Sequence, residues 1–378
     1  MQCDSGAPVL EFFAGGGLAR LGLEPAFRCV FANDIDPAKA RAYRAAFGDD
    51  VMREGDIWHL SPEDLPGKAA LAWASFPCQD LSLAGARRGL AAPRSGAFWG
   101  FHGLIEKLAQ ARRAPDILAI ENVTGLLSSH GGADFTALIH ALDALKYRVG
   151  ALEIDAAHFT PQSRQRLFVV AARSAPAHLT QSGPSAPFHS TALRGVVARL
   201  PDGLRKRFVW WRLNMPPTRN TRLADLIDDT DTAWDDAEKT ARLIAQMSPL
   251  QRERLDALRQ SGRREIGAVF RRIRVEHGER VQRAEARFDG VAGCLRTPAG
   301  GSSRQILLFV EGDTVRSRLL NPREAARLMG VPDDYTLPEG QTAALHLLGD
   351  AVCVPVVRWL SNNLLEPLAG LAEARKRA

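Results

Sequence analysis

Residues 71–82 read Leu-Ala-Trp-Ala-Ser-Phe-Pro-Cys-Gln-Asp-Leu-Ser, an apolar run that ends in a proline and a cysteine. The run from Leu71 to Ser75 predicts a short strand, and Pro77 ends it because proline cannot donate a hydrogen bond to a sheet ladder. Cys78 therefore lies where a strand gives way to a loop, which is where open α/β sheets carry their chemistry. A thiolate at such a point is a candidate nucleophile. The alternative is a small buried apolar residue, the commoner role of a free cysteine.

A strand, a glycine-rich turn and a helix are predicted near the start of the chain. Residues 8–13 read as a buried strand, 14–17 as an Ala-Gly-Gly-Gly turn and 18–23 as a helix, the beginning of a nucleotide-binding βαβ unit. Glycines let the backbone approach a ligand without a Cβ in the way. The dinucleotide fingerprint Gly-x-Gly-x-x-Gly is not met because Arg20 occupies its third glycine position, which disfavours a nicotinamide cofactor.

An acidic residue follows the end of the next predicted strand, and a second one follows further along the chain, where no third strand is evident. Residues 28–33 predict a strand that ends at Asp34, where a carboxylate accepts hydrogen bonds from ribose hydroxyls. Ile35 is placed to cover an adenine face, and the pair Asp56-Ile57 repeats the order of an acid and an apolar residue. The alternative for each acid is a helix cap or turn residue. Together with the glycine turn, these features predict a nucleoside-containing cofactor.

The chain continues as alternating strands and helices. Strands are predicted at 116–120, 148–155 and 167–171, and helices at 99–112 and 133–146. Glu121 follows a strand end and is a general-acid candidate. Two arginines, Arg164 and Arg166, precede the strand at 167–171, and we expect one to enter the site and the other to support the fold.

A second domain is predicted after the Ala-, Pro- and Ser-rich segment 174–190. Residues 191–290 hold 21 Lys and Arg against 15 Asp and Glu, whereas the rest of the chain holds 28 of each. A localised basic region is typical of contact with a phosphate backbone, and the alternative is a solvated, arginine-rich surface. Apart from a helical pattern at 237–260, this region reads as irregular.

Regular structure is predicted again near the end of the chain. The pattern gives a strand at 306–310, a helix at 322–329 and a last helix that Gly349-Asp350 opens. The five cysteines are scattered, which predicts neither a disulfide framework nor a zinc site. No apolar run approaches the ~18 residues of a membrane span, and the N-terminus lacks the features of a signal peptide, so an intracellular location is expected.

In this order, the motifs resemble those of DNA (cytosine-5)-methyltransferases. The family's Asp/Glu-x-Phe-x-Gly-x-Gly, Pro-Cys-Gln, Glu-Asn-Val, Gln-x-Arg-x-Arg and Arg-Glu-x-Ala-Arg-Leu-Met-Gly blocks match residues 11–17, 77–79, 121–123, 162–166 and 323–330. Its ribose-binding acid matches Asp34 and its adenine-contacting pair matches 56–57. The blocks cover about 1–172 and 290–360, and the family's variable target-recognition domain lies where the basic excess falls. Two departures are Asp350 in the family's Gly-Asn pair and Cys294 in its Thr-Leu pair.

The resemblance implies an α/β fold, with a Rossmann-like S-adenosylmethionine-dependent methyltransferase core and a smaller irregular target-recognition domain. It implies a catalytic and cofactor-binding domain at 1–185, a basic target-recognition domain at 186–320, and a hinge with return to the catalytic domain at 321–378. It also implies S-adenosyl-L-methionine as cofactor, duplex DNA and a cognate restriction endonuclease as partners, no membrane, and a monomeric cytoplasmic protein associated with the nucleoid.

The resemblance also assigns residues to roles, with no metal site. The catalytic set is Cys78, Glu121, Arg164 and Arg166. The cofactor-binding set is Phe13, Ala14, Gly15, Gly17, Asp34, Ile35, Asp56, Ile57, Pro77, Phe98, Asp350 and Val352. The DNA-binding set is Gln79, Ser82, Arg87, Arg88, Arg94, Arg271, Arg272 and Arg274.

The implied chemistry begins when the Cys78 thiolate adds to C6 of a cytosine that has been flipped out of the duplex. Glu121, in protonated form, hydrogen-bonds N3, Arg166 holds O2, and C5 takes the methyl group from S-adenosylmethionine. The loop from Gln79 to Arg94 is expected to close over the base. The alternatives are a tRNA cytosine-5 methyltransferase, a non-catalytic DNA-binding relative and a small-molecule methyltransferase.

Overall fold

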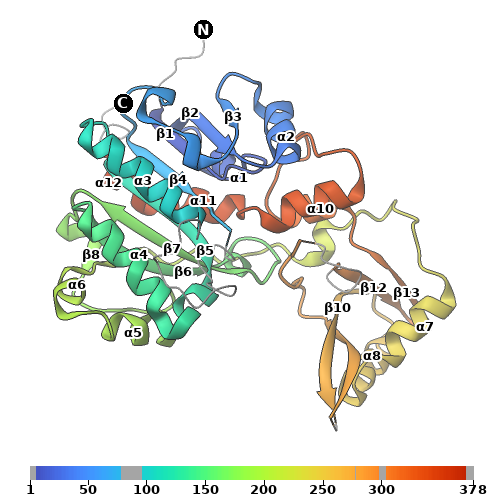
Figure 1. The fold of residues 1–378 in the computed structure, drawn as a ribbon. Coiled ribbons are helices and arrows are strands. Elements are labelled where there is room, and N and C mark those ends of the chain that lie inside the picture. The colour runs from blue at the N-terminus through green and yellow to red at the C-terminus, as the bar shows by residue number, and fades with distance from the viewer. Residues whose placement is uncertain (1–5, 78–95, 277, 298–303, 372–378) are drawn as a thin grey trace. The chain divides into compact units, whose positions relative to one another are not determined.

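The computed structural model describes residues 6–77, 96–276, 278–297 and 304–371, in two compact units (Figure 1). The first unit comprises Met1–Asp155, Gln165–Met215 and Val356–Ala378, and the second comprises Ala156–Arg164 and Pro216–Pro355. The boundaries of these units differ from the boundaries of the predicted domains. Residues 186–215 belong to the first unit because their aromatic side chains pack on its sheet; Trp211 is fully buried and donates to the Val170 carbonyl at 3.1 Å.

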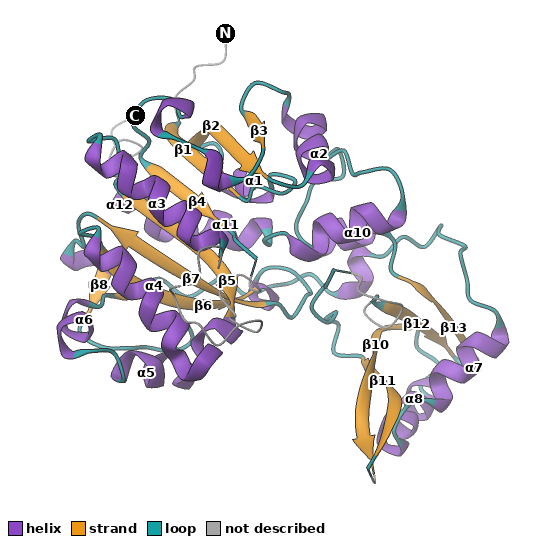
Figure 2. Cartoon of the chain, in the orientation of Figure 1, coloured by secondary structure: helices purple, strands orange, loops and turns teal. Residues whose placement is uncertain are grey.

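The first unit is built on a seven-stranded sheet in the order β3-β2-β1-β4-β5-β7-β6 (Figure 2). Its elements are β1 (Ala7–Phe12), α1 (Leu18–Leu23), β2 (Phe27–Asp34), α2 (Pro37–Phe47), β3 (Met52–Glu54), β4 (Leu71–Ala74), α3 (Ala97–Gln110), β5 (Ile117–Val123), α4 (Ala133–Ala144), β6 (Arg148–Asp155), β7 (Gln165–Ala172), β8 (Thr180–Gln181), α5 (Thr191–Ala198), α6 (Asp202–Arg207), β9 (Trp210–Trp211), most of α11 (Val354–Leu360), and α12 (Glu366–Leu368). Only β7 runs against the other strands of this sheet. The predicted α/β class with a parallel sheet is confirmed.

The strand order places the predicted site at the centre of the sheet. The chain runs from β1 outward through β2 to β3 and then returns to β4 on the other side of β1. Open α/β sheets bind their ligands at such a switch point, outside the carboxyl ends of the two central strands. The glycine turn follows β1 and Pro77 follows β4, so both start from this edge.

Alternate strand residues make the core of the first unit. Phe12, Ala74 and Ile120 are buried in one cluster with the apolar sides of α3 and α4, represented by Phe101 and Leu138. All four residues of β4 are buried, which explains why its sequence is continuously apolar instead of alternating.

The second unit contains a four-stranded antiparallel sheet in the order β11-β10-β12-β13. Its elements are α7 (Ala237–Ala245), α8 (Pro249–Gln260), β10 (Glu265–Glu276), β11 (Glu279–Arg287), β12 (Ile306–Glu311), β13 (Thr314–Leu319), α9 (Pro322–Leu328) and α10 (Gln341–Asp350). The region predicted to be irregular is therefore a regular sheet backed by helices. The strand predicted at 306–310 is β12, whereas β10 and β11 were missed. Arginines occupy both faces of β10 beyond Phe270, so the sequence does not alternate between apolar and polar residues.

A buried ion pair holds β13 to α9 in the second unit. The Arg318 guanidinium and the Glu324 carboxylate have no exposed side-chain surface and lie 2.6 Å apart. Glu324 also accepts from the Asn321 backbone N–H at 2.9 Å, while the Asn321 side chain accepts from the Glu324 N–H, which forms a capping box. The glutamate of the Arg-Glu-x-Ala-Arg block thus fixes the start of α9.

The stretch Gln341–Leu368 is long and apolar enough to span a membrane by length and composition alone, with a mean hydropathy of 1.4. Of its most apolar window, 56% is buried inside the protein, as in a core helix of a soluble protein. Residues 351–353 also interrupt it between α10 and α11. The stretch is therefore weak evidence for a membrane span.

Candidate active site

The turn after β1 is shaped by backbone that favours glycine. Gly15 and Gly17 have φ of 56° and 76°, and Phe13 shares this left-handed region at 56°. A Cβ on Gly17 would lie 2.3 Å from the Phe47 ring, so this position has no room for a side chain. A Cβ on Gly15 would meet no atom within 4 Å. The turn thus packs tightly on one side and leaves open space at Gly15, as a ligand-binding loop requires.

Asp34 closes this turn from the end of β2. Its two carboxylate oxygens accept hydrogen bonds from the Gly15 N–H at 2.8 Å and the Asp36 N–H at 2.9 Å. Burial raises the pKa of Asp34, and the two backbone donors oppose that rise. Each oxygen keeps a lone pair for a ribose hydroxyl. Ile35, beside it, is 62% exposed and free to cover an adenine ring.

The second acid–apolar pair has a structural role of its own. Asp56 accepts from the Trp58 N–H at 3.1 Å and caps a short 3-10 turn. Ile57 is buried, and a Cβ added to Gly100 would lie 2.7 Å from it. The cap that was the alternative interpretation of Asp56 is therefore present, and its contact with a cofactor stays a prediction.

A buried carboxyl lies under the glycine turn. Glu11 is 1% exposed, and the Tyr43 hydroxyl and the Arg20 backbone N–H each donate to it at 3.3 Å. Burial raises the pKa of Glu11 to about 8, although these donors and the Arg20 charge lower it. Glu11 on β1 thus forms hydrogen bonds with α1 and α2, and these bonds stabilise the glycine turn between β1 and α1.

Three aromatic rings connect the glycine turn to the strand end before Cys78. The Phe13 and Phe76 ring centroids are 6.1 Å apart, and those of Phe76 and Phe98 are 5.6 Å apart. Phe98 has no exposed surface, so in this conformation it supports Phe76. The Asn122 side chain donates to the Phe76 carbonyl at 3.1 Å and fixes the backbone that leads into exposed Pro77. Ala14 is buried within the turn.

The predicted nucleophile and its loop lie outside the described residues. This applies to Cys78, Gln79, Ser82, Arg87, Arg88 and Arg94.

Glu121 and Arg166 meet at the carboxyl edge of the sheet. Because β7 is antiparallel to β5, its start lies beside the end of β5, with Glu121 opposite Phe168 and Val123 opposite Arg166. Side chains two positions apart share a face, so Glu121 and Arg166 are diagonal neighbours on one side of the sheet. The Arg166 Nε lies 3.2 Å from the Glu121 carboxylate, and Glu121 is 6% exposed.

Arg164 has a different environment, within the second unit. The residue is 2% exposed, and its guanidinium donates to the carbonyls of Leu295 at 2.7 Å, Gly349 at 3.0 Å and Ala351 at 2.6 Å. Gln162 of the same block accepts from the Leu295 N–H at 3.1 Å. Of the two arginines, Arg164 is thus the one that supports the fold, and its predicted catalytic role does not fit a guanidinium surrounded by backbone carbonyls.

Asp350 is the last residue of α10 and does not open a helix, contrary to the prediction. The last helix, α11, begins at Val354, because 351–353 break the helical backbone. A helix N-terminus therefore does not stabilise the Asp350 carboxylate, since the C-terminal end of a helix carries partial negative charge. The Asp350 carboxylate accepts from the Thr297 hydroxyl at 2.8 Å, and Val352 is buried.

The three predicted DNA-binding arginines of β10 do not share one face. Arg272 and Arg274 both pair with Glu285 of β11, while Arg271 lies on the opposite face by strand alternation. Two exposed apolar residues, Ile273 and Val275, extend that opposite face toward the hairpin tip.

Among the described residues, no group of three or more His, Cys, Asp or Glu could hold a metal ion. Sequence reasoning gave no role to Asn122, Gln162 or Glu11, although all three belong to the matched blocks. Their positions in those blocks could have marked them as functional. Their roles could not be predicted, because their hydrogen-bond partners lie in distant parts of the chain.

Asp34→Asn is expected to weaken binding of the nucleoside cofactor about 10- to 100-fold, because hydrogen bonds to a charged group contribute ~1.5–3 kcal/mol. Isothermal titration calorimetry with S-adenosylmethionine measures this. Asp36→Asn is the matched control: Asp36 caps α2, and Asn caps helices as well as Asp does. Equal S-adenosylmethionine affinities of wild type and Asp34→Asn would show that Asp34 does not bind the cofactor.

Known proteins resemble this chain over nearly its whole length. A family model for C-5 cytosine-specific DNA methylase matches residues 8–366. The Type II methyltransferase M.NlaX of Neisseria lactamica is 27% identical over 371 residues, which cover 97% of this chain and 99% of that protein. M.HhaI of Haemophilus parahaemolyticus is 25% identical over 95% of this chain and 94% of its own length.

Solved structures share the fold. The Dnmt2 methyltransferase of S. pombe has a TM-score of 0.61 at 18% identity and covers 96% of this chain and 99% of its own. A putative DNA modification methyltransferase of an E. coli prophage has a TM-score of 0.55 at 16% identity, with 98% and 100% coverage. Because the family match extends over most of the chain, the chain belongs to the C-5 cytosine-specific DNA methylases, enzymes that transfer a methyl group from S-adenosylmethionine to cytosine C5 in DNA.

Proposed function

We propose that this enzyme methylates cytosine in duplex DNA after flipping the base out of the helix and bonding it covalently to Cys78. The observation that supports this most is the pairing of Glu121 with Arg166 at the carboxyl edge of the sheet, with an Nε–Oε1 distance of 3.2 Å. Glu121 lies on β5, the strand next to β4, and Pro77, the residue before Cys78 in the sequence, follows shortly after the end of β4.

Each residue of the proposal supplies one element of the reaction. The Cys78 thiolate forms a bond to C6 of cytosine, which makes the ring electron-rich at C5. Glu121, protonated, donates to N3, and the Arg166 cation holds O2. When bound, S-adenosylmethionine supplies the electrophilic methyl group that C5 accepts. Loss of the C5 proton and of the Cys78 sulfur then restores the aromatic ring and releases 5-methylcytosine.

The cofactor residues fit their roles unequally. Gly15, Asp34 and Ile35 combine open space, a carboxylate with spare lone pairs and an exposed apolar side chain. These three support a bound nucleoside at the switch point. Asp350 and Val352 belong to the second unit, and their contact with the cofactor remains part of the proposal.

The partner and domain roles follow from the same family. We assign catalysis and cofactor binding to the first unit and target recognition to the second. The Type II names of the relatives favour a restriction-modification system, and hence a cognate endonuclease. A soluble cytoplasmic enzyme that acts as a monomer is part of the same proposal.

Transfer of tritium-labelled methyl groups from S-adenosylmethionine to duplex DNA and to tRNA tests this function directly. We expect labelling of DNA alone. Labelling of tRNA alone would transfer the assignment to an RNA enzyme, and labelling of neither by a folded, cofactor-binding protein would favour a non-catalytic relative. Bisulfite sequencing of DNA from cells that express the protein then gives the recognition site.

Replacing Arg271, Arg272 and Arg274 together by glutamine is expected to weaken DNA binding and leave S-adenosylmethionine affinity unchanged. Each lost phosphate contact reduces the slope of log K against log salt by about 1, whereas loss of a base contact relaxes sequence preference. Fluorescence anisotropy at several salt concentrations measures both. Arg41→Gln on α2 is the control for removing a positive charge elsewhere. Unchanged DNA affinity and site choice in the triple variant would show that the β10–β11 hairpin does not recognise DNA.

Asp350→Asn restores the family's residue and is expected to change S-adenosylmethionine affinity by less than tenfold, or ~1.4 kcal/mol. The reason is that an amide oxygen also accepts the bond from the Thr297 hydroxyl. Calorimetry and the methyl-transfer assay on both proteins check this. A wild type that is inactive on all duplex DNA, together with an active Asp350→Asn, would show instead that Asp350 disables the site.

A further inference from the structure

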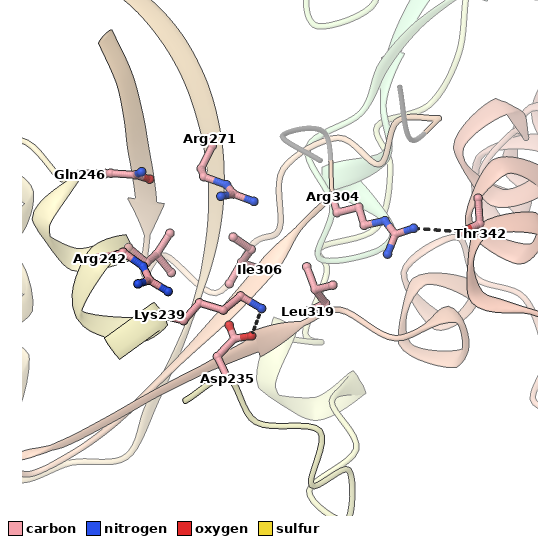
Figure 3. A pocket seen from close by; sticks show the side chains of 10 residues that line it. Asp235, Lys239, Arg242, Gln246, Arg271, Arg304, Ile306, Leu319 and Thr342 are labelled. Carbon is pink, nitrogen blue, oxygen red and sulfur yellow. Dashed lines mark hydrogen bonds and ion pairs between the residues drawn. The ribbon is translucent and has the colours of Figure 1, made fainter. Parts of the chain in front are cut away.

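The second unit contains a cavity of about 380 Å³ between α7, the sheet and the start of α10 (Figure 3). It is lined by Asp235, Lys239, Arg242, Leu243, Gln246, Arg271, Arg304, Ile306, Leu319 and Thr342. All ten residues lie within one compact unit.

Helix α7 supplies one wall because of its sequence spacing. Lys239 and Arg242 are three residues apart, so they share a helix face. Leu243 and Gln246 continue the same face on the next turn. This face of α7 therefore presents two cations, Lys239 and Arg242, next to one apolar side chain, Leu243.

The sheet supplies the opposite wall through its register. Ile306 is paired with Val269 on one side and with Leu319 on the other, so these three side chains lie in one row on one face. Arg271 follows Val269 by two residues and projects from that same face. Ile306 and Leu243 are 5% and 6% exposed, which gives the cavity an apolar floor.

Positive charge dominates the lining. Of the ten lining residues, Lys239, Arg242, Arg271 and Arg304 are cations and Asp235 is the one acid. Asp235 already accepts from Lys239 and from the Ser317 hydroxyl at 2.8 Å, and Arg242 pairs with Glu238 outside the lining. Arg304 donates to the Thr342 hydroxyl at 2.9 Å. The remaining excess of cations around a concave, partly apolar surface focuses a positive potential that favours an anion.

The ligand class follows from size and lining together. The volume is at the lower end of the ~300–1,000 Å³ usual for small-molecule sites, and an apolar floor does not serve a bare inorganic anion. We propose that this cavity binds a nucleoside phosphate, with the phosphate held by Arg271, Arg304 and Lys239 and the base against Leu243, Ile306 and Leu319. The phosphate comes either from a free mononucleotide or from a nucleotide of bound DNA, and only the second source rests on the proposed function.

Titration of the full chain with thymidine 5′-monophosphate tests the free-nucleotide source. Thymine avoids competition from an adenine- or cytosine-binding site. We expect calorimetric binding of the monophosphate, at least tenfold weaker binding of thymidine, and at least a tenfold loss in Arg304→Gln and in Lys239→Gln. Arg316→Gln is the control, because Arg316 is an exposed cation on β13 whose side chain lies on the opposite face from Leu319.

Salt-dependent binding of a duplex tests the DNA source with the same variants. Arg304→Gln is expected to reduce the slope of log K against log salt by about 1, while Arg316→Gln does not. Binding of the monophosphate supports a free mononucleotide as the source. A changed salt slope without monophosphate binding supports a nucleotide of bound DNA. The proposal is overturned if Arg304→Gln changes neither the affinity for the monophosphate nor the salt slope of DNA binding. It is also overturned if Arg304→Gln and Arg316→Gln have equal effects. Methyl transfer by wild type is scored separately, so a failed cavity does not count against the proposed function.

Discussion

Cys78→Ala is expected to reduce methyl transfer at least ~10⁴-fold, or about 5.4 kcal/mol of transition-state stabilisation at 1.36 kcal/mol per tenfold. Without the sulfur, C6 has no nucleophile to bond with, and C5 of cytosine is too electron-poor to accept the methyl group. The affinities for S-adenosylmethionine and DNA should stay close to wild type, because neither depends on a covalent bond. Tritium transfer and calorimetry measure the two effects separately.

Cys29→Ala is the matched control for removal of a thiol. Burial raises the pKa of Cys29 to about 12, so this thiol is inert at neutral pH, and its removal should leave turnover nearly unchanged. Turnover of Cys78→Ala within tenfold of wild type would exclude Cys78 as the nucleophile.

The covalent step can also be trapped. A duplex with 5-fluorocytosine at the target cannot lose fluorine as it loses a proton, so the Cys78 adduct should accumulate in the presence of cofactor. A denaturing gel then shows a protein–DNA band for wild type and none for Cys78→Ser. Absence of that band for wild type on a validated site would contradict covalent catalysis.

Glu121→Gln is expected to lower kcat about 10²- to 10⁴-fold, the usual contribution of a positioned acid or base. Glutamine keeps the size of the side chain and still accepts from Arg166, but it cannot present a carboxylic acid to N3. The affinity for S-adenosylmethionine should be unchanged, because Glu121 pairs with Arg166 on β7, away from Asp34 at the end of β2. Single-turnover methylation with saturating cofactor isolates the chemical step.

Glu153→Gln is the control for a buried carboxylate in the same sheet. Glu153 lies on β6, is 5% exposed and is not part of the proposed site. Thermal unfolding of both variants separates loss of stability from loss of chemistry. If Glu121→Gln retains wild-type single-turnover rates, Glu121 is not the acid, and the role of the pair is structural.

The strand and turn pattern of the first unit could be predicted well because it depends on neighbours in the sequence. The helix at 18–23 and the strand at 148–155 have the predicted bounds, since turn residues and apolar periodicity are local signals. The strand at 116–120 was predicted too short: β5 runs to Val123, because Glu121 and Asn122 are polar residues that the sheet itself buries. The second unit was predicted less well, since arginines on both faces of β10 conceal its alternation.

The sequence by itself determined the family, the order of the motifs, the class of fold and the identity of the cofactor, because each depends on residue types in a fixed linear order. The tertiary structure alone decided which residues meet. The reversal of β7 brings Arg166 to Glu121, whereas Arg164, two residues earlier, binds the carbonyls of Leu295, Gly349 and Ala351. Strand pairing and burial join residues far apart in the chain, and no local pattern encodes such contacts.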